Sequence, residues 1–414
     1  MGGQVGAYAL VAAVAALGTY LATFPVRRIA TQVGFVATPD ERRVHSRPTP
    51  YGGGAAMFLA FLVAMVVASL LSPLHQEFAG SSEPLGLLLG AAVIFGVGLI
   101  DDVRDMSAPA KMAGQVLAAM LLTIFGVTMF GFKVPLVGYF VLSPDYVPLL
   151  TALWVIGITN AVNLIDGLDS LAAGIVAIAS GALAVYGIRL VHLGFLPADN
   201  IGPLIAAVTF GVCIGFLPHN FHPARVFMGD AGALLLGLLM AAATMVIGGR
   251  APDYSGSTYF FFAPLLIPVF ILGVPIADML FAVVRRTARR TGFHTPDKDH
   301  VHHRLLRLGH GHRRTVVILW GWSAVLSAFV LLPLFGFHQA NAIVPFGAVV
   351  LGLGLYTMFN PGLRKHGLAD EAQIDSPIEP SADAADRSDE SDAADASGTS
   401  DASIDVGVGG DGDA

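Results

Sequence analysis

The chain has few charged residues and a single cysteine. Of its 414 residues, 13% are charged and 55% are hydrophobic, whereas roughly 25% of residues are charged in soluble domains. Cys213 cannot form an intramolecular disulfide or a cysteine-based metal cluster, so we interpret it as a buried, inert thiol. The longest interior polar loop, 285–314, is shorter than a usual domain, which excludes a separate soluble catalytic domain in that loop.

Long apolar segments recur along most of the chain, and the mean hydropathy is +0.69. Each segment is near the roughly 20 residues with which a helix spans a bilayer, so we predict an all-α polytopic membrane protein with about eleven transmembrane helices. The first segment has neither a basic leader nor a convincing cleavage site, so it is predicted to be a helix rather than a signal peptide. The segments are 6–25, 52–72, 84–100, 109–129, 146–164, 171–193, 201–217, 231–248, 259–284, 315–335 and 341–359.

Basic residues are distributed unevenly between the loops that join these segments. With the N-terminus outside, 20 of the 23 Lys and Arg residues lie on the cytoplasmic side, and only Lys133, Arg189 and Arg250 lie outside. Because Lys and Arg accumulate in cytoplasmic loops, this bias predicts an odd number of helices, an external N-terminus and a cytoplasmic C-terminus.

The composition changes near the C-terminus to Asp, Ala, Ser and Gly. We predict a transmembrane domain over residues 1–365 and an acidic, disordered tail over residues 366–414. Counted from Asp370, the tail holds 14 of the 30 acidic residues, so the net charge of −7 hides a basic membrane body. A basic inner face suits anionic lipids and anionic substrates.

Four polar clusters fall on the predicted cytoplasmic side. The first ends the third apolar segment and contains Asp101, Asp102 and Asp105. On a continuing helix, Asp101 and Asp105 share one face while Asp102 points aside. Adjacent acids at a lipid boundary are costly, which favours a functional role; a helix end marked by solvated charge is the alternative.

The second cluster contains oxygen-bearing side chains at a spacing of three: Asn160, Asn163, Asp166 and Asp169. On a helix they would draw a polar stripe through apolar surroundings, and Gly167 permits a break. Such oxygens suit Mg²⁺, which usually keeps waters and shares phosphate oxygens of a substrate. An interhelical amide contact and a helix cap are the alternatives.

The third cluster leads into the eighth apolar segment and contains Asn220, His222, Arg225, Phe227 and Asp230. Taken alone, Asp230 could be a helix cap. Beside a glycine-flanked turn, a carboxylate can also hold a cation while backbone N–H groups face phosphate. Phe227 offers a flat surface on which a base could stack.

The fourth cluster lies in the most basic loop and contains His300, His302, His303 and Arg304. We interpret it as a phosphate-binding group. A zinc site, which would lack an HExxH pattern and thiolates, and a solvated juxtamembrane loop are the alternatives. A fifth stretch before the second segment is a loop shaped by prolines and glycines, and its His45 and Arg47 could meet a phosphate.

Taken together, these motifs resemble the bacterial polyprenyl-phosphate N-acetylhexosamine-1-phosphate transferases, the WecA-type and MraY-type enzymes of glycosyltransferase family 4. The resemblance covers about residues 25 to 315 and rests on HSRPTPYGGG, GLIDDVRD, NAVNLIDGLDSLAAG, FMGDAG and HVHHR. It implies an all-helical membrane fold with a cytoplasmic active site that depends on Mg²⁺, with Mn²⁺ as a substitute. It also implies transfer of a sugar 1-phosphate from a UDP-sugar to a polyprenyl phosphate, with release of UMP.

The resemblance further implies roles for individual residues. Asp230 would be the chief Mg²⁺ ligand, and Asp101 or Asp102 would assist the lipid-phosphate nucleophile or the metal. Asn163 would be a further metal ligand, and Phe227 would stack on uracil. The other substrate-binding residues would be Asn160, Asp166, Asp169, Asn220, His45, Arg47, His302, His303 and Arg304.

Three features favour the WecA-type branch and therefore GlcNAc as the sugar: Asp105, the HVHHR form of the last motif, and the predicted cytoplasmic C-terminus. Ser170 departs from the family pattern, which often has glycine there. The alternatives are a phospho-MurNAc-pentapeptide transferase and a transferase for another UDP-N-acetylhexosamine. We expect a bacterial inner-membrane protein whose partners are UDP-GlcNAc, undecaprenyl or decaprenyl phosphate and the lipid bilayer, without nucleic acid; a homodimer stays open.

Two other classes of protein also place acidic residues among membrane helices. An intramembrane prenyltransferase uses DDxxD-type aspartates with Mg²⁺, but it usually needs a second such cluster, and NLIDGLDS lacks that spacing. A transporter should carry ionisable residues near the middle of its helices, whereas here the acids gather at one face. Release of UMP from a UDP-sugar distinguishes the predicted transferase from both.

Overall fold

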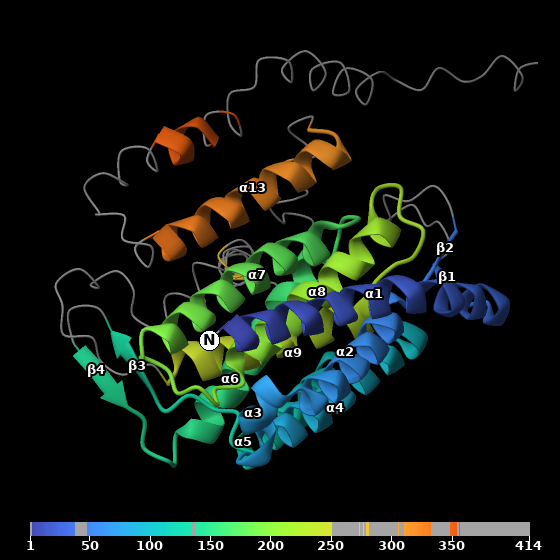
Figure 1. The fold of residues 1–414 in the computed structure, drawn as a ribbon. Coiled ribbons are helices and arrows are strands. Elements are labelled where there is room, and N and C mark those ends of the chain that lie inside the picture. The colour runs from blue at the N-terminus through green and yellow to red at the C-terminus, as the bar shows by residue number, and fades with distance from the viewer. Residues whose placement is uncertain are drawn as a thin grey trace, which may run out of the picture. The chain divides into compact units, whose positions relative to one another are not determined.

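The computed structural model describes residues 2–37, 48–134, 138–250, 310–332 and 348–353, and the single residues 273, 276, 279, 280, 305 and 356. Within these residues, eight helices are long and apolar enough to cross a membrane, and a ninth apolar helix, α5 (Ala108–Ile124), is shorter. The eight are α1 (Gly2–Val33), α2 (Gly53–Leu70), α4 (Glu83–Arg104), α6 (Val147–Ile165), α7 (Leu171–His192), α8 (Gly202–Asn220), α9 (Gly229–Gly248) and α13 (His312–Leu331) (Figure 1).

An all-α polytopic membrane fold is therefore confirmed. The predicted segments 259–284 and 341–359 lie largely outside the described residues, as does the predicted tail, 366–414. The count of eleven helices and the orientation of the termini stay predictions.

Proline marks the first turn of several helices. Pro84, Pro109, Pro148 and Pro203 stand in the first two positions of α4, α5, α6 and α8. Proline suits this position because its φ is already helical and its missing N–H would have no intrahelical partner. Four helix starts were therefore visible in the sequence.

Helix α9 is the most enclosed helix of the described part, and every residue from Ala231 to Gly248 is buried. It packs against α2, α4, α6 and α8, and Figure 1 shows it among these helices. A Cβ on Gly98 of α4 would lie only 2.5 Å from the Cα of Ala231. Small residues let helix backbones approach closely in a membrane, so the end of α4 lies directly against the start of α9.

Short elements join the helices at both ends. Strands β1 (Val36–Ala37) and β2 (Thr49–Pro50) pair antiparallel between α1 and α2, and β3 (Gly131–Val134) pairs antiparallel with β4 (Gly138–Val141) between α5 and α6. A 3₁₀ turn, η1 (Ser72–Leu74), and the short helix α3 (His75–Ala79) connect α2 to α4. The sequence analysis did not predict these elements.

The expected common face for Asp101 and Asp105 is wrong. Helix α4 ends at Arg104, and Asp105 adopts a left-handed backbone with φ +43°, which takes it off the helix. Helix α6 likewise ends at Ile165, so the second cluster is divided between a helix and a turn, at the break that Gly167 permits. Asp and Ser hydrogen-bond to nearby backbone and favour turns over helix, which explains the early ends.

Candidate active site

The ends of four helices bring polar side chains together. Asp101 lies in the last turn of α4, Lys111 in the first turn of α5, Asn163 in the last turn of α6 and Asp230 in the first turn of α9. Lys111 Nζ lies 2.8 Å from Asp101 Oδ2 and also contacts Asp230 Oδ2. Asn163 Nδ2 donates to Asp230 Oδ1 at 2.9 Å. These four residues form what we call the acid–lysine cluster.

Asp102 points away from this cluster and holds the start of α9. Its Oδ1 accepts a hydrogen bond from the backbone N–H of Asp230 at 2.7 Å, and its Oδ2 accepts one from Ala231 at 3.0 Å. A carboxylate at a helix N-terminus satisfies amides that lack intrahelical partners and interacts favourably with the helix dipole. The prediction that Asp102 points aside from Asp101 is confirmed.

Gly229 makes this approach of α4 to α9 feasible. Its φ is +71°, a conformation that glycine adopts without the strain of a side chain. A Cβ at this position would also overlap the carboxylate of Asp102. The glycine in the FMGDAG motif is therefore required by the backbone that carries Asp230.

Asp166 caps the C-terminal end of α6 beside the acid–lysine cluster. Burial, followed by the negative charges of Asp230, Asp102 and Asp169, raises the pKa of Asp166 well above its usual range. The smaller, electrostatic part of the shift reflects the closeness of these carboxyl groups. The first three sequence clusters therefore meet at one end of the described helices.

Asn220 connects the turn after α6 to the loop between α8 and α9. Its side-chain oxygen accepts from the backbone N–H of Ser170 at 2.7 Å, and its amide donates to the carbonyl oxygen of Val226 at 3.0 Å. Only 4% of the residue is exposed. Asn220 thus supports the site by fixing two loops, without itself joining the acid–lysine cluster.

A second group of side chains lies next to that turn. The buried Asp169 carboxylate accepts from His222 Nδ1 at 2.7 Å and from the backbone N–H of Ala224 at 3.1 Å. The ring of His222 stacks on that of His312, with centroids 4.1 Å apart and planes 23° apart. Arg313 donates to the carbonyl oxygen of His222, so this group fastens the start of α13 to the site.

Asp169, His222 and His312 have the composition of a transition-metal site, since one ligand atom of each lies within 4.8 Å of the others. The geometry argues against it. A metal binds imidazole nitrogen in the plane of the ring at about 2.0–2.1 Å, and two stacked, nearly parallel rings cannot both meet that condition with one ion. Asp169 is better described as the acceptor of a hydrogen bond from His222.

The acid–lysine cluster fits a hard divalent cation better. Asp101, Asp230 and Asn163 carry carboxylate and amide oxygens, the ligands that Mg²⁺ prefers, and Mg²⁺ usually needs only a few of them because it keeps waters. The carboxylates are accessible as well as close, since the side chains of Asp101 and Asp230 are 13% and 32% exposed. The donor set is therefore suitable for Mg²⁺ or Mn²⁺.

Phe227 lies at the edge of the site in the loop before α9. Its backbone N–H donates to the carbonyl oxygen of Pro50 at 2.9 Å, and its carbonyl oxygen accepts from Gly53 at 3.0 Å. Its ring centroid lies 5.9 Å from that of Tyr51. The glycine-rich stretch before α2 thus packs directly against the FMGDAG loop, as the order of the motifs alone could not show.

Other predicted site residues are placed elsewhere or lie outside the described residues. Asn160 donates to Gln115 of α5 at 3.0 Å, an interhelical amide contact. Asp105 is exposed to solvent. The predicted phosphate-binding residues His45, Arg47, His300, His302, His303 and Arg304 lie outside the described residues, so their roles stay predictions.

Lys111 is the site residue that the sequence analysis missed. It was counted among the cytoplasmic basic residues, but its ammonium group joins Asp101 to Asp230. A signal was present, because Lys111 is the only charged residue in the apolar stretch 108–124 and ionisable residues in membrane helices are usually functional. Its position soon after the DDVRD motif strengthens that signal.

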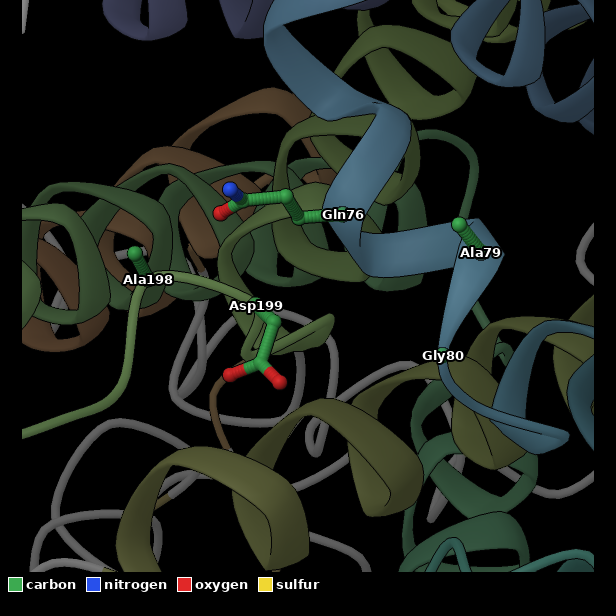
Figure 2. Close-up of a pocket in the computed structure, with 5 residues that line it drawn as sticks. All are labelled: Gln76, Ala79, Gly80, Ala198 and Asp199. Atoms are coloured by element: carbon green, nitrogen blue, oxygen red, sulfur yellow. The ribbon is translucent and has the colours of Figure 1, made fainter.

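A cavity of about 440 Å³ lies at the opposite end of the described helices. Figure 2 shows its lining: Gln76, Ala79 and Gly80 from α3 and its end, and Ala198 and Asp199 from the loop before α8. This end carries the start of α1, because Gln4 donates to the carbonyl oxygen of Ala198 at 3.1 Å. The cavity is therefore separate from the acid–lysine cluster.

Known proteins resemble this chain over the region that holds the site. Residues 84–248 match the sequence profile of glycosyl transferase family 4. The chain is 41% identical over 368 residues to the decaprenyl-phosphate N-acetylglucosaminephosphotransferase of Mycobacterium tuberculosis, which covers 86% of this chain and 89% of that protein.

Two further relatives carry related names. A probable undecaprenyl-phosphate N-acetylglucosaminyl 1-phosphate transferase of Bacillus subtilis is 37% identical over 327 residues, or 78% of this chain and 84% of that protein. A phospho-N-acetylmuramoyl-pentapeptide-transferase of Moorella thermoacetica is 33% identical over 294 residues, or 67% of this chain and 82% of that protein. The similarity to the Mycobacterium tuberculosis and Bacillus subtilis proteins is thus both higher and longer than that to the Moorella thermoacetica protein.

Proposed function

Since this chain belongs to glycosyl transferase family 4, we propose that it transfers GlcNAc 1-phosphate from UDP-GlcNAc to a polyprenyl phosphate. An oxygen of the lipid phosphate bonds to the sugar-bearing phosphorus, and the bond from that phosphorus to the bridging oxygen breaks. UMP leaves, and polyprenyl-diphosphate-GlcNAc remains in the membrane. The observation that carries the proposal is the meeting of Asp101, Lys111, Asn163 and Asp230 from four helices.

Electrostatics is the main obstacle to this reaction, because two anions must come into contact. Phosphoryl transfer is promoted mainly by positioning and by charge placed where it is needed. Lys111 supplies one positive charge at the cluster. Bound to Asp230, Asp101 and Asn163, Mg²⁺ would neutralise diphosphate oxygens and polarise the bond that breaks.

The two adjacent aspartates are proposed to have different roles. Both oxygens of Asp102 accept backbone hydrogen bonds from the start of α9, so Asp102 positions Asp230. Asp101 faces Lys111 and Asp230 across the cluster and is favoured as the group that orients the lipid phosphate. Substitution of Asp102 should therefore disturb folding more than substitution of Asp101, and both substitutions should lower activity.

We place this site at the cytoplasmic face of a bacterial inner membrane. The described end that carries the cluster also carries Arg27, Arg28, Arg104, Arg225 and Arg313, whereas the opposite end carries Arg189 and Arg250. Basic residues gather on the cytoplasmic side of membrane proteins. The lipid chain of the acceptor would stay in the bilayer and present its phosphate at that interface.

The sugar is proposed to be GlcNAc because the Mycobacterium tuberculosis and Bacillus subtilis relatives named for it have 41% and 37% identity. A relative named for phospho-MurNAc-pentapeptide transfer has 33% identity, which makes that reaction the second candidate. The residues that contact the sugar would decide between these two reactions. His302, His303 and Arg304, which the family resemblance assigns to the diphosphate, lie outside the described residues.

The test is a reconstituted reaction with the full chain purified in detergent. Decaprenyl phosphate, Mg²⁺ and either UDP-GlcNAc, UDP-GalNAc or UDP-MurNAc-pentapeptide are added, and UMP release and the mass of the lipid product are measured. We expect UMP and a lipid-linked GlcNAc diphosphate with UDP-GlcNAc, and neither without the lipid or with EDTA. A protein that forms no lipid-linked product from any of the three nucleotides would disprove the proposal.

A further inference from the structure

The carboxylate oxygens around the cluster are nearly all committed to defined partners. Asp101 Oδ1 accepts from the backbone N–H of Met106 at 2.6 Å, and Asp230 Oδ1 accepts from Asn163. Both oxygens of Asp102 accept from backbone amides. The oxygens of Asp101 and Asp230 that remain are the two Oδ2 atoms, and both contact Lys111 Nζ.

The Lys111 ammonium group therefore occupies the position between the two carboxylates that any cation joining them would need. Mg²⁺ binds oxygen at about 2.0–2.1 Å, which is closer than an ammonium nitrogen approaches an oxygen. An ammonium group and a divalent cation at the same two oxygens would also repel each other strongly. The two cations cannot share Asp101 and Asp230 in the described arrangement.

We propose that Lys111 is a resident counter-cation that competes with the divalent ion for Asp101 and Asp230, and so sets how tightly the ion binds before substrate arrives. This inference rests on the metal site of the proposed function. Without an ion, Lys111 neutralises two partly buried acids whose repulsion would otherwise destabilise the helix ends. With an ion, Lys111 must leave that position.

The displaced lysine would need another anionic partner. Its four-carbon stem is flexible and its ammonium group binds phosphate as a point charge, so a diphosphate bound at the cluster would provide one. Ion binding and diphosphate binding would then strengthen each other, because each favours the arrangement with Lys111 turned away from the acids. Such coupling must be reciprocal.

The direct test measures binding of Mn²⁺ to the full chain in detergent without any substrate, by loss of the free Mn²⁺ signal in electron paramagnetic resonance. We expect Lys111→Met, which keeps an unbranched side chain one atom shorter and removes its charge, to bind Mn²⁺ at least 10-fold more tightly than the unaltered protein. Lys111→Arg keeps the charge and should bind Mn²⁺ no more tightly than the unaltered protein. Equal or weaker Mn²⁺ binding by Lys111→Met would overturn the inference.

Arg104→Met is the matched control. Arg104 is an exposed basic residue at the end of α4, near the cluster in sequence, and its substitution removes the same charge. It should change Mn²⁺ affinity less than 2-fold. A gain as large as that of Lys111→Met would show that general charge, and not occupation of the site, controls binding, and would overturn the inference.

A second measurement needs no variant and stays decisive if Lys111→Met does not fold. Lysines of the unaltered protein are labelled with an amine-reactive acetylating reagent, and modification of Lys111 is followed by mass spectrometry. Saturating Mg²⁺ should raise the labelling rate of Lys111 several-fold, because the amine leaves its ion pairs, and unchanged or slower labelling would contradict the inference. Since neither experiment contains a UDP-sugar, failure to release UMP would count against the proposed function only.

Discussion

The two ends of the described helices surround their acidic side chains with different partners. At the active-site end, Asp101 and Asp230 share the charge of Lys111, and Asp102 accepts two backbone N–H groups. At the opposite end, Glu77 is 1% exposed, and its described partners are the neutral Tyr8 and Gln4. The first arrangement places a positive charge beside two of the carboxylates, whereas the second gives Glu77 only neutral hydrogen-bond donors.

The cause of the difference at Glu77 is the lack of compensating positive charge among the described residues around it. Tyr8 donates to Glu77 Oε1 at 2.7 Å, while Glu77 Oε2 is buried without a hydrogen-bond partner in the part of the chain that the structure describes. Burial, with a smaller contribution from Asp199, raises the pKa of Glu77 to about 7. A buried acid in this setting is a structural group, whereas partly exposed acids beside a cation can bind substrate or metal.

Removing the negative charge of Asp230 should have the largest effect on the active-site end. We expect Asp230→Asn to lower the rate of UMP release by at least about 100-fold, the loss typical of removing one preorganised electrostatic group from an active site. The protein should remain folded, because asparagine has nearly the same shape and Lys111 keeps its contact with Asp101. The measurement is UMP release together with thermal unfolding in detergent.

Asp105→Asn is the control for this substitution. Asp105 is an acid of the same motif, but it is exposed and its left-handed backbone is one that asparagine tolerates. Its loss should change activity less than 3-fold. If Asp230→Asn keeps its activity, or if Asp105→Asn loses activity to the same extent, the negative charge of Asp230 has no specific role at the start of α9.

A second prediction concerns the backbone that joins Asp102 to α9. Gly229→Ala places a methyl group against the Asp102 carboxylate at φ +71°. We expect a loss of about 2–4 kcal/mol, which combines the cost of a left-handed residue with the loss of a helix cap. The unfolding temperature in detergent and the rate of UMP release should both fall.

Gly194→Ala separates these two contributions. Gly194 has φ +73° and lies after α7 at the opposite end, where a Cβ would meet nothing within 4 Å. Its substitution should cost only about 1–2 kcal/mol, the left-handed backbone alone. If both alanine variants unfold at the same temperature, the contact between Gly229 and Asp102 contributes no stability.

The part of this fold that the sequence predicts follows from composition and length. Apolar runs of about 20 residues identify the helices regardless of how they pack, since each satisfies its own backbone hydrogen bonds. The three clusters are predicted to lie at one end because an even number of predicted membrane crossings separates each cluster from the next. Both inferences need only the order of residues along the chain.

The contacts inside the site depend on packing and could not be predicted in this way. Asp102 reaches the amides of α9 only because Gly98 lets α4 lie against Ala231. Lys111 and Glu77 were overlooked for the same reason, since each has a partner more than 60 residues away: Asp230 for Lys111 and Tyr8 for Glu77. The turn after α6 interrupted a stripe that would have been continuous on one helix.

The third prediction concerns pH and the opposite end. Because the pKa of Glu77 is about 7 in the folded protein and 4.5 ordinarily, the folded state binds the proton more tightly. The stabilisation is complete below pH 4.5 and is lost as the pH rises towards and through 7. At about 1.36 kcal/mol for each pKa unit, the loss is on the order of 3 kcal/mol.

Glu77→Gln removes this titration while keeping the size of the side chain. The unfolding temperature of the unaltered protein should fall between pH 5 and pH 8, about the range over which Glu77 ionises, and the glutamine variant should show a smaller fall. Asp145→Asn, at an exposed acid in the loop before α6, should behave like the unaltered protein. If the glutamine variant keeps the whole fall in unfolding temperature, Glu77 is not the group responsible.

The smallest predicted effect is at Ser170, where the family resemblance leads us to expect glycine. Ser170 adopts φ +62° at the start of α7, a left-handed conformation that costs a non-glycine residue about 1–2 kcal/mol. Its hydroxyl donates to the carbonyl oxygen of Asp169 at 2.7 Å, which returns part of that cost. Ser170→Gly should therefore raise the unfolding temperature slightly, by a free energy of about 0.5–1 kcal/mol.

Ser170→Ala is the informative companion, because it keeps the backbone cost and loses the hydroxyl. It should unfold below the unaltered protein, so the order of stability should be glycine, serine, alanine. Asn220 binds the backbone N–H of residue 170 and not its side chain, so both variants should retain UMP release within about 3-fold. An alanine variant more stable than the glycine variant would mean that the left-handed backbone at this turn imposes no cost, and that the serine reflects selection on chemistry at the site.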